Sequence, residues 1–150
     1  MKCLSVSQPF ADLIVKGKKT IELRGWNTNF RGEFLIHAPL KIRKDDYKRL
    51  KIKTKLPTGV IIGKAQIYDV KKYNSKSDVE KDSKKHFASS KFFNTKYGFC
   101  LHKAKEFHVP IPCKGKLGFF EVKLNEKIKK NKIKRDLFEE EYRYQWINQH

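Results

Sequence analysis

The chain has 150 residues, and its 35 Lys and Arg against 16 Asp and Glu give a formal net charge of +19. This length is typical of one domain with its own core, and the 39% of apolar residues exclude a chain that is disordered throughout. The apolar runs are far shorter than the ~20 residues that span a bilayer, so we expect a soluble, cytoplasmic protein without a membrane partner.

Short elements alternate along the first forty residues. Residues 2–6 predict a strand, and Pro9 opens a helix of about two turns that Gly17 can end in a left-handed conformation. Apolar and polar side chains alternate over 19–25, which predicts a half-buried strand, and a further strand is expected over 32–37. We expect these two strands to form a hairpin.

The remainder of the chain predicts longer strands. The Lys-rich segment 41–55 indicates a basic surface helix, and a long curved strand over 60–70 follows it, with Gly63 as a bend or bulge. Two more strands are expected over 97–107 and 117–124, joined by a turn that contains prolines. Five or six strands with few helices indicate an α+β fold, a small β-barrel with peripheral helices.

The three cysteines form no CxxC pair. Cys100 and Cys113 lie near His102 and His108 in the sequence, but their spacing matches no common zinc site. We therefore expect reduced thiols, no metal and no cofactor.

A charged motif lies between the first predicted helix and the strand that follows it. Gly17, Lys19, Glu22 and Arg24 stand in the order GxKxxExR. Further matching segments are 4–11, 13–24, 31–32, 35–38 and 111–118, together with Trp26. Over residues 1–124 the chain resembles the ASCH domain family of the PUA-like superfamily. The resemblance implies a small, partly open β-barrel with a cleft beside the motif, and contact with RNA or another nucleic acid.

The extension over 125–150 lies outside this resemblance. It is first strongly basic and then acidic and aromatic. Phe138, Tyr142 and Trp146 recur at helical spacing, so we expect the extension to be helical and to pack on the domain.

Lys19, Glu22 and Arg24 are the candidate ligand-binding residues of the cleft. An arginine offers a planar fork, a lysine a mobile charge, and a glutamate an acceptor for the amine of a base. Without the resemblance, the same alternation is also typical of a solvated strand face on which Glu22 and Arg24 pair.

Five further residues complete the predicted interface. Gln8 precedes Pro9 and is a poor helix cap, so we expect a ligand-facing amide there. Trp26 stacks on a base or covers the end of the barrel. Arg31 and the basic pair Lys129 and Lys130 are expected to contact the nucleic-acid backbone.

Two other residues are given structural roles. Phe10 is assigned to the core because of its helical spacing with Leu13 and Ile14, and His37 to a structural position at the end of a strand.

An enzymatic alternative stays open. Some ASCH-like enzymes hydrolyse N4-acetylcytidine with the motif lysine, a threonine three residues later and a glutamate. Lys19 matches that lysine, but Glu22 occupies the threonine position, so the hydroxyl nucleophile is missing. Lys19 and Glu22 could still form the catalytic acid–base pair of a ribonuclease or nucleoside amidohydrolase.

The main prediction is a module that binds RNA or single-stranded nucleic acid, with DNA as a possible ligand. A hydrolase is the first alternative and a protein-interaction module the second. The oligomeric state does not follow from the sequence.

Overall fold

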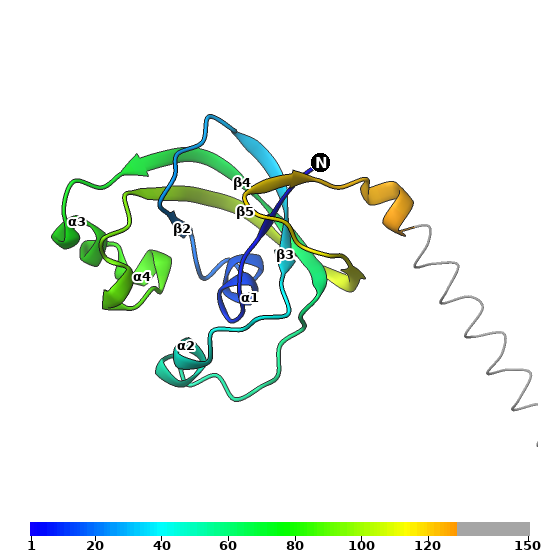
Figure 1. Cartoon of the computed structure of the whole chain (residues 1–150), viewed down its shortest axis with the longest axis horizontal. Coiled ribbons are helices and arrows are strands. Elements are labelled where there is room, and N and C mark those ends of the chain that lie inside the picture. The colour runs from blue at the N-terminus through cyan, green and yellow to red at the C-terminus, as the bar shows by residue number, and fades with distance from the viewer. Residues whose placement is uncertain (129–150) are drawn as a thin grey trace, which may run out of the picture.

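The computed structural model describes residues 1–128, which form a curled sheet surrounded by short helices (Figure 1). The strands are β1 (Lys2–Ser5), β2 (Ile21–Arg24), β3 (Gly32–Ala38), β4 (Val60–Lys72), β5 (Tyr97–Pro112) and β6 (Phe119–Glu121). The helices are α1 (Phe10–Val15), α2 (Lys44–Arg49), α3 (Lys76–Lys81), α4 (Ser83–His86) and the short 3-10 helix η1 (Ser90–Phe92).

Within these residues the sheet has the order β2-β5-β4-β3-β1-β6. β1 and β3 are parallel, and the other neighbouring strands are antiparallel. This six-stranded, half-closed barrel with helices around it confirms the expected α+β fold. β2 pairs along its length with β5, not with β3, so the hairpin expected from two consecutive strands is wrong.

α1 packs beneath the arch of the long strands β4 and β5 and also contacts β3 (Figure 1). Its buried side chains are Ala11, Leu13, Ile14 and Val15, which leaves Asp12 towards solvent. Gly17 follows the helix with a φ of +75°, the left-handed conformation expected for its end. The helix therefore fixes the position at which the motif segment enters β2.

Gly63 forms the expected bulge in β4. The pairing register of β4 with β5 shifts between Ile61 and Gly63. A Cβ atom at Gly63 would overlap the backbone carbonyl oxygen of Lys105 and lie 2.7 Å from Cγ1 of Val15. Only glycine allows β4 to bend so closely over both β5 and α1.

Two expectations about the later elements are wrong. The basic helix ends after Arg49, because Lys51 takes a left-handed conformation with a φ of 56°. The strand predicted to stop at residue 107 continues to Pro112. Proline is tolerated there because β2 covers β5 only over residues 97–100, so the end of β5 pairs on one side alone.

The predicted helical extension reaches into residues that the structure does not describe. Residues 124–128 are helical, whereas 129–150, with Lys129 and Lys130, lie outside the described residues. Across residues 1–128, no helix is both long and apolar enough to cross a lipid bilayer.

Candidate functional site

A cavity of about 340 Å³ opens between β2, the segment that follows β1, and the chain from α4 to β5. We call it the pocket. Its lining residues are Ser5, Val6, Ser7, Phe10, Lys19, Glu22, Leu23, Arg24, Gly25, Arg43, Ala88, Phe92 and Thr95. The three charged motif residues predicted from the sequence thus line one cavity.

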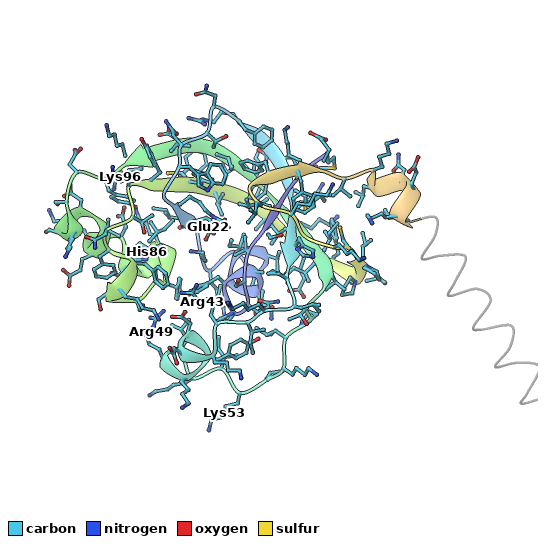
Figure 2. The ribbon with its side chains drawn as sticks, in the orientation of Figure 1. Glu22, Arg43, Arg49, Lys53, His86 and Lys96 are labelled. Atoms are coloured by element: carbon cyan, nitrogen blue, oxygen red, sulfur yellow. The ribbon has the colours of Figure 1, made fainter. Side chains whose placement is uncertain are left out.

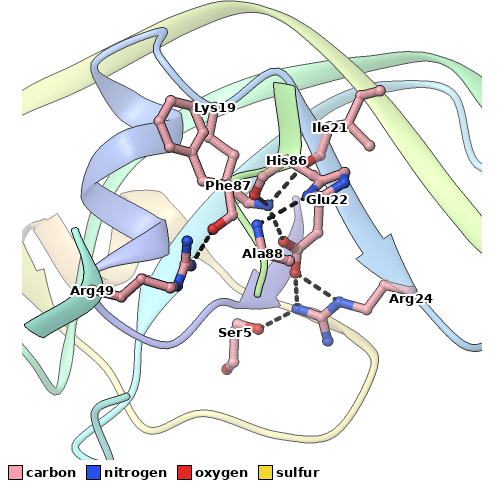
Figure 3. A network of polar contacts seen from close by, with 9 residues as sticks. All are labelled: Ser5, Lys19, Ile21, Glu22, Arg24, Arg49, His86, Phe87 and Ala88. Atoms are coloured by element: carbon pink, nitrogen blue, oxygen red, sulfur yellow. Dashed lines mark hydrogen bonds and ion pairs between the residues drawn. The ribbon is translucent and has the colours of Figure 1, made fainter. Parts of the chain in front are cut away.

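Lys19 lies at the base of the pocket and is only 3% exposed. Its Nζ donates to the carbonyl oxygens of Ile21 at 2.7 Å and His86 at 2.6 Å, and lies 3.2 Å from Oε1 of Glu22 (Figure 3). An ammonium group has three protons, so these three acceptors use all of them. Lys19 therefore supplies charge to the pocket and orients Glu22, and has no proton left for a direct hydrogen bond to a ligand.

Glu22 joins Lys19 to Arg24. Its Oε2 accepts from Nε of Arg24 at 2.9 Å and lies 2.7 Å from Nη2, which also donates to the carbonyl oxygen of Ser5 at 2.8 Å (Figure 3). Within residues 1–128, Nη1 of Arg24 donates to no protein group. The side chain of Arg24 is 23% exposed, so Nη1 is the donor that the motif leaves for a ligand.

The surroundings of Glu22 favour its ionised form. Burial alone raises the pKa of its carboxyl group, but the charges and hydrogen bonds of Lys19 and Arg24 outweigh this effect and hold that pKa below its usual value. Burial lowers the pKa of the Lys19 ammonium group, and the negative charge of Glu22 offsets part of this lowering. The pocket base is therefore an ionised carboxylate held by two cations.

The segment after α4 forms the opposite wall of the pocket. The ring of His86 is fully buried, donates through Nε2 to the carbonyl oxygen of Val79 and accepts at Nδ1 from the backbone N–H of Ala88. Burial lowers the pKa of this ring, in keeping with a neutral tautomer. The next residue, Phe87, has a φ of 62°, and its carbonyl oxygen accepts from Arg49 of α2 (Figure 3).

Lys19 and Arg49 consequently hold two consecutive carbonyl groups, those of His86 and Phe87. One cation comes from the entry to β2 and the other from α2. The wall of the pocket is thus fixed by side chains far apart in the sequence, and the left-handed turn at Phe87 directs the chain towards Ala88 and Phe92.

Lys19, Glu22 and Arg24 converge as the motif suggests, and the pairing of Glu22 with Arg24 occurs in a pocket instead of on a solvated strand face. Glu22 is only 8% exposed. The open alternative of a solvated face is therefore wrong for Glu22. Tertiary packing of the segment after α4 buries this side chain.

Gln8 does not face a ligand, so this expectation is wrong. Its side chain is fully buried, donates through Nε2 to the carbonyl oxygen of Pro57 and accepts at Oε1 from the backbone N–H of Asp12. The amide satisfies an otherwise unpaired N–H in the first turn of α1 and ties the loop before β4 to the helix.

Trp26 and Arg31 are not among the residues that line the pocket. Trp26 packs edge-on against Phe99 and Phe119, with ring centroids 5.2 and 5.7 Å away, so it covers the end of the barrel. Arg31 is exposed and donates to the carbonyl oxygens of Thr28 and Phe30 in its own loop. Trp26 therefore takes the second of its two expected roles, and Arg31 lies outside the pocket.

The structure also tests the roles expected for Phe10 and His37. Phe10 packs against the core as expected, and its ring in addition lines the pocket, 5.2 Å from Nζ of Lys19. His37 is 2% exposed and bonds to Ser5 Oγ at 2.8 Å and to the carbonyl oxygen of Cys113 at 2.7 Å. Its expected structural role is confirmed.

The sequence reasoning missed Arg43 and Phe92. The guanidinium carbon of Arg43 lies 4.5 Å from the centroid of the Phe92 ring, and both residues line the pocket. The one available signal was that Arg43 and Arg49 are arginines in a segment, 41–55, whose other cations are lysines. Nothing in the local pattern around Phe92 marks it as a pocket residue.

Comparison with known proteins gives one family. The model of the ASCH domain matches residues 4–114. Activating signal cointegrator 1 of Homo sapiens is 51% identical over 39 residues, which make up 26% of this chain. The match spans only 7% of the length of that human protein.

Solved structures show the same fold at low sequence identity. The crystal structure of ASCH from Zymomonas mobilis superposes with a TM-score of 0.61 at 18% identity, covering 85% of this chain and 91% of that one. A mutant of the Zymomonas mobilis protein gives a TM-score of 0.61 at 17% identity, covering 88% of this chain and 94% of the other.

Proposed function

The chain belongs to the ASCH domain family, and from this membership we propose that it binds single-stranded nucleic acid, RNA in the first place, with one unpaired nucleotide in the pocket. The observation that carries the proposal is the buried cluster of Lys19, Glu22 and Arg24 at the base of a cavity of about 340 Å³. This volume lies near the lower end of the range for small-molecule sites, which suits a single nucleotide.

The lining of the pocket suits a flat, polar-edged ligand. Phe10 and Phe92 offer apolar ring surface, on which bases stack irrespective of their sequence. Arg24 offers the N–H groups of Nη1, and the carboxylate of Glu22 keeps an acceptor position on Oε1 beyond its bond with Lys19. A donor and an acceptor in the same pocket can bind the polar edge of a base once it is unpaired.

The charges in the pocket favour an anion. Lys19, Arg24 and Arg43 carry three positive charges against the single negative charge of Glu22, a sum of 3 − 1 = +2. Part of this charge lies below the surface, where solvent and salt screen it less than they screen an exposed lysine. A nucleotide phosphate at the mouth of the pocket satisfies this excess.

The bonding of the motif favours binding over hydrolysis. A general base needs a pKa near the working pH, whereas the pKa of Glu22 is lowered by two cations. All three protons of Lys19 are already bonded, so releasing one to a leaving group would break the contact that holds His86 or Glu22. These features support an electrostatic platform for a ligand.

A comparison of two arginine variants tests the proposal. We expect Arg24→Gln to weaken binding of a fluorescein-labelled single-stranded RNA by about tenfold, since it removes a charge-assisted contact. Arg31→Gln removes the same charge outside the pocket and should change the affinity by less than about twofold. Fluorescence anisotropy gives the dissociation constants, and thermal unfolding checks that both variants are folded.

Duplex RNA and single-stranded DNA of the same sequence serve as competitors. Single strands should compete and the duplex should not, because a paired base cannot enter the pocket. Equal effects of the two arginine variants, or a duplex that competes as well as the single strand, contradict the proposal. Turnover of N4-acetylcytidine or RNA by the wild type, lost in Glu22→Gln, would instead favour the hydrolase.

A further inference from the structure

A second cavity, of about 610 Å³, adjoins the pocket on the side of α2. We call it the basic cavity. It is lined by Leu40, Lys41, Ile42, Arg43, Lys44, Asp45, Asp46 and Lys91. Arg43 lines both cavities, and the neighbours Lys91 and Phe92 line one each, so the two cavities lie next to each other on either side of Arg43.

Arg43 is held in place at this junction. Its guanidinium stacks on the Phe92 ring, and its Nε lies 3.5 Å from Oδ2 of Asp46, whose side chain is 2% exposed. Asp46 is fixed in turn by Arg49, at 3.0 Å from Oδ1. The backbone N–H of Arg43 donates to the carbonyl oxygen of Gln8 at 2.9 Å. Backbone, ring and carboxylate together orient this arginine.

The two terminal nitrogens of Arg43 donate to no other group in the described part of the chain. They form a planar fork, the geometry that binds two phosphate oxygens at once. The stacking on Phe92 uses the flat face of the guanidinium, and the ion pair with Asp46 uses Nε. The terminal nitrogens can therefore bind a phosphate without breaking either contact.

The residues that line the basic cavity carry a net positive charge. Its four cations stand against two carboxylates, a sum of 4 − 2 = +2. Both carboxylates have partners: Asp46 pairs with the two arginines, and Asp45 lies 3.8 Å from Lys91 in an exposed pair of little strength. Lys41 and Lys44 are exposed and form no ion pair within residues 1–128. They stay available to an external anion.

We propose that the basic cavity receives the sugar–phosphate chain that continues from the nucleotide in the pocket, with Arg43 bound to the phosphate between two nucleotides. The inference rests on the proposed function and specifies its ligand as a strand of at least two nucleotides. A free nucleoside fills the pocket alone and leaves the basic cavity, with its net positive charge, without an anion. Lys41 and Lys44 bind the next phosphate along the strand.

Competition by short ligands tests the chain length. The probe is a labelled single-stranded RNA of about ten nucleotides, and the competitors are a nucleoside monophosphate and the dinucleotide of the same base. For the wild type we expect the dinucleotide to compete at least about tenfold better than the monophosphate, because it adds charge-assisted phosphate contacts. In the variant Arg43→Gln this advantage should shrink to about twofold, because Arg43 binds the phosphate between the two nucleotides.

The salt dependence of binding provides a second readout with a matched control. Each phosphate contact on a single strand contributes about 0.7 to the slope of log affinity against log salt, so the double variant Lys41→Gln/Lys44→Gln, which loses one phosphate contact, should lower the slope by about 0.7. Lys53→Gln/Lys96→Gln removes the same charge from two exposed lysines that lie away from Arg43 and outside both cavities (Figure 2). The control should keep the slope of the wild type.

The outcomes separate the two proposals. If no labelled single strand binds the wild type, the proposed function fails. If the monophosphate competes as well as the dinucleotide while Arg24→Gln still weakens binding, the pocket stands and the strand path is wrong. An equal loss of slope in the two double variants also overturns the strand path, because general surface charge then explains the binding.

Discussion

Glu22 is the residue on which the charges of the pocket depend. Its carboxylate is the anion that the buried ammonium of Lys19 and the guanidinium of Arg24 share. Removing it leaves the Lys19 ammonium, which is only 3% exposed, without its counter-charge. A buried charge whose partner is lost is far more costly than a broken surface pair.

We expect Glu22→Gln to lower the free energy of unfolding at neutral pH by about 3 kcal/mol, since the variant breaks a buried ion pair. Glu22 has a lowered pKa in the folded state, so its contribution is present above its ordinary pKa of 4.5 and is lost as the pH falls through the lowered value. The difference between wild type and variant should therefore narrow below about pH 4.5. Urea unfolding at several pH values measures it.

Glu33→Gln is the matched control for this substitution. Glu33 pairs with Lys64, but its side chain is 38% exposed, so its loss should change the stability by less than about 0.5 kcal/mol at every pH. If the difference in free energy of unfolding between wild type and Glu22→Gln stayed constant down to strongly acidic pH, the ion pair would not be the cause of the destabilisation.

Among the elements, β4 determines the curvature of the sheet. It is the strand that pairs with both β3 and β5, and its pairing with β5 shifts register in three places. The bulge at Gly63 brings the backbone of β5 and the side chain of Val15 in α1 close together. The bend therefore seats α1, which in turn positions Lys19 and Phe10.

Gly63→Ala should destabilise the protein by about 1–3 kcal/mol, because its methyl group overlaps a backbone carbonyl that cannot move as a side chain can. Gly25→Ala is the control: a Cβ there meets no atom within 4 Å, so the expected change is below about 0.5 kcal/mol. Thermal unfolding of the two variants gives the comparison. Similar midpoints for both would contradict a close-packed bulge.

Short elements that are far apart in the sequence also form the wall of the pocket. α2 supplies Arg49, the entry to β2 supplies Lys19, and these two cations hold the carbonyl groups at the end of α4. None of these helices is longer than six residues, so they depend on such tertiary contacts. Pocket shape and helix stability are therefore linked through the same few bonds.

For the whole molecule, the net charge of +19 has two opposite consequences. Like charges repel one another in the folded protein, which lowers its stability at low ionic strength. The same charges attract a polyanion, and salt weakens that attraction by removing the gain from counterion release.

We therefore expect added salt to act in opposite directions on stability and on binding. Raising sodium chloride from about 20 mM to about 300 mM shortens the screening length severalfold and should raise the unfolding midpoint of the free protein. The affinity for single-stranded RNA should fall over the same range. Thermal scans and anisotropy titrations measure the two effects. A midpoint that falls, or an affinity that stays constant, contradicts this account.

The sequence predicted the local elements well where periodicity and glycine or proline decide them. The helix between Pro9 and Gly17 and the bulge at Gly63 were confirmed. The motif spacing also placed Lys19, Glu22 and Arg24 together, because a strand positions Glu22 and Arg24 on one face and Lys19 enters it directly. Local patterns suffice for such features because their causes lie within a few residues.

Tertiary structure alone decided which polar groups serve the site and which serve the fold. Gln8 and Glu22 are both buried polar residues. The side-chain amide of Gln8 is bonded to the backbone of Pro57 and Asp12, whereas Glu22 lines the pocket. Arg43 and Phe92 meet only because β4, β5 and the short helices bring residues about fifty positions apart into contact. A chemical pattern in the sequence identifies candidate side chains, but contacts with residues distant along the chain determine which of them remain available to a ligand.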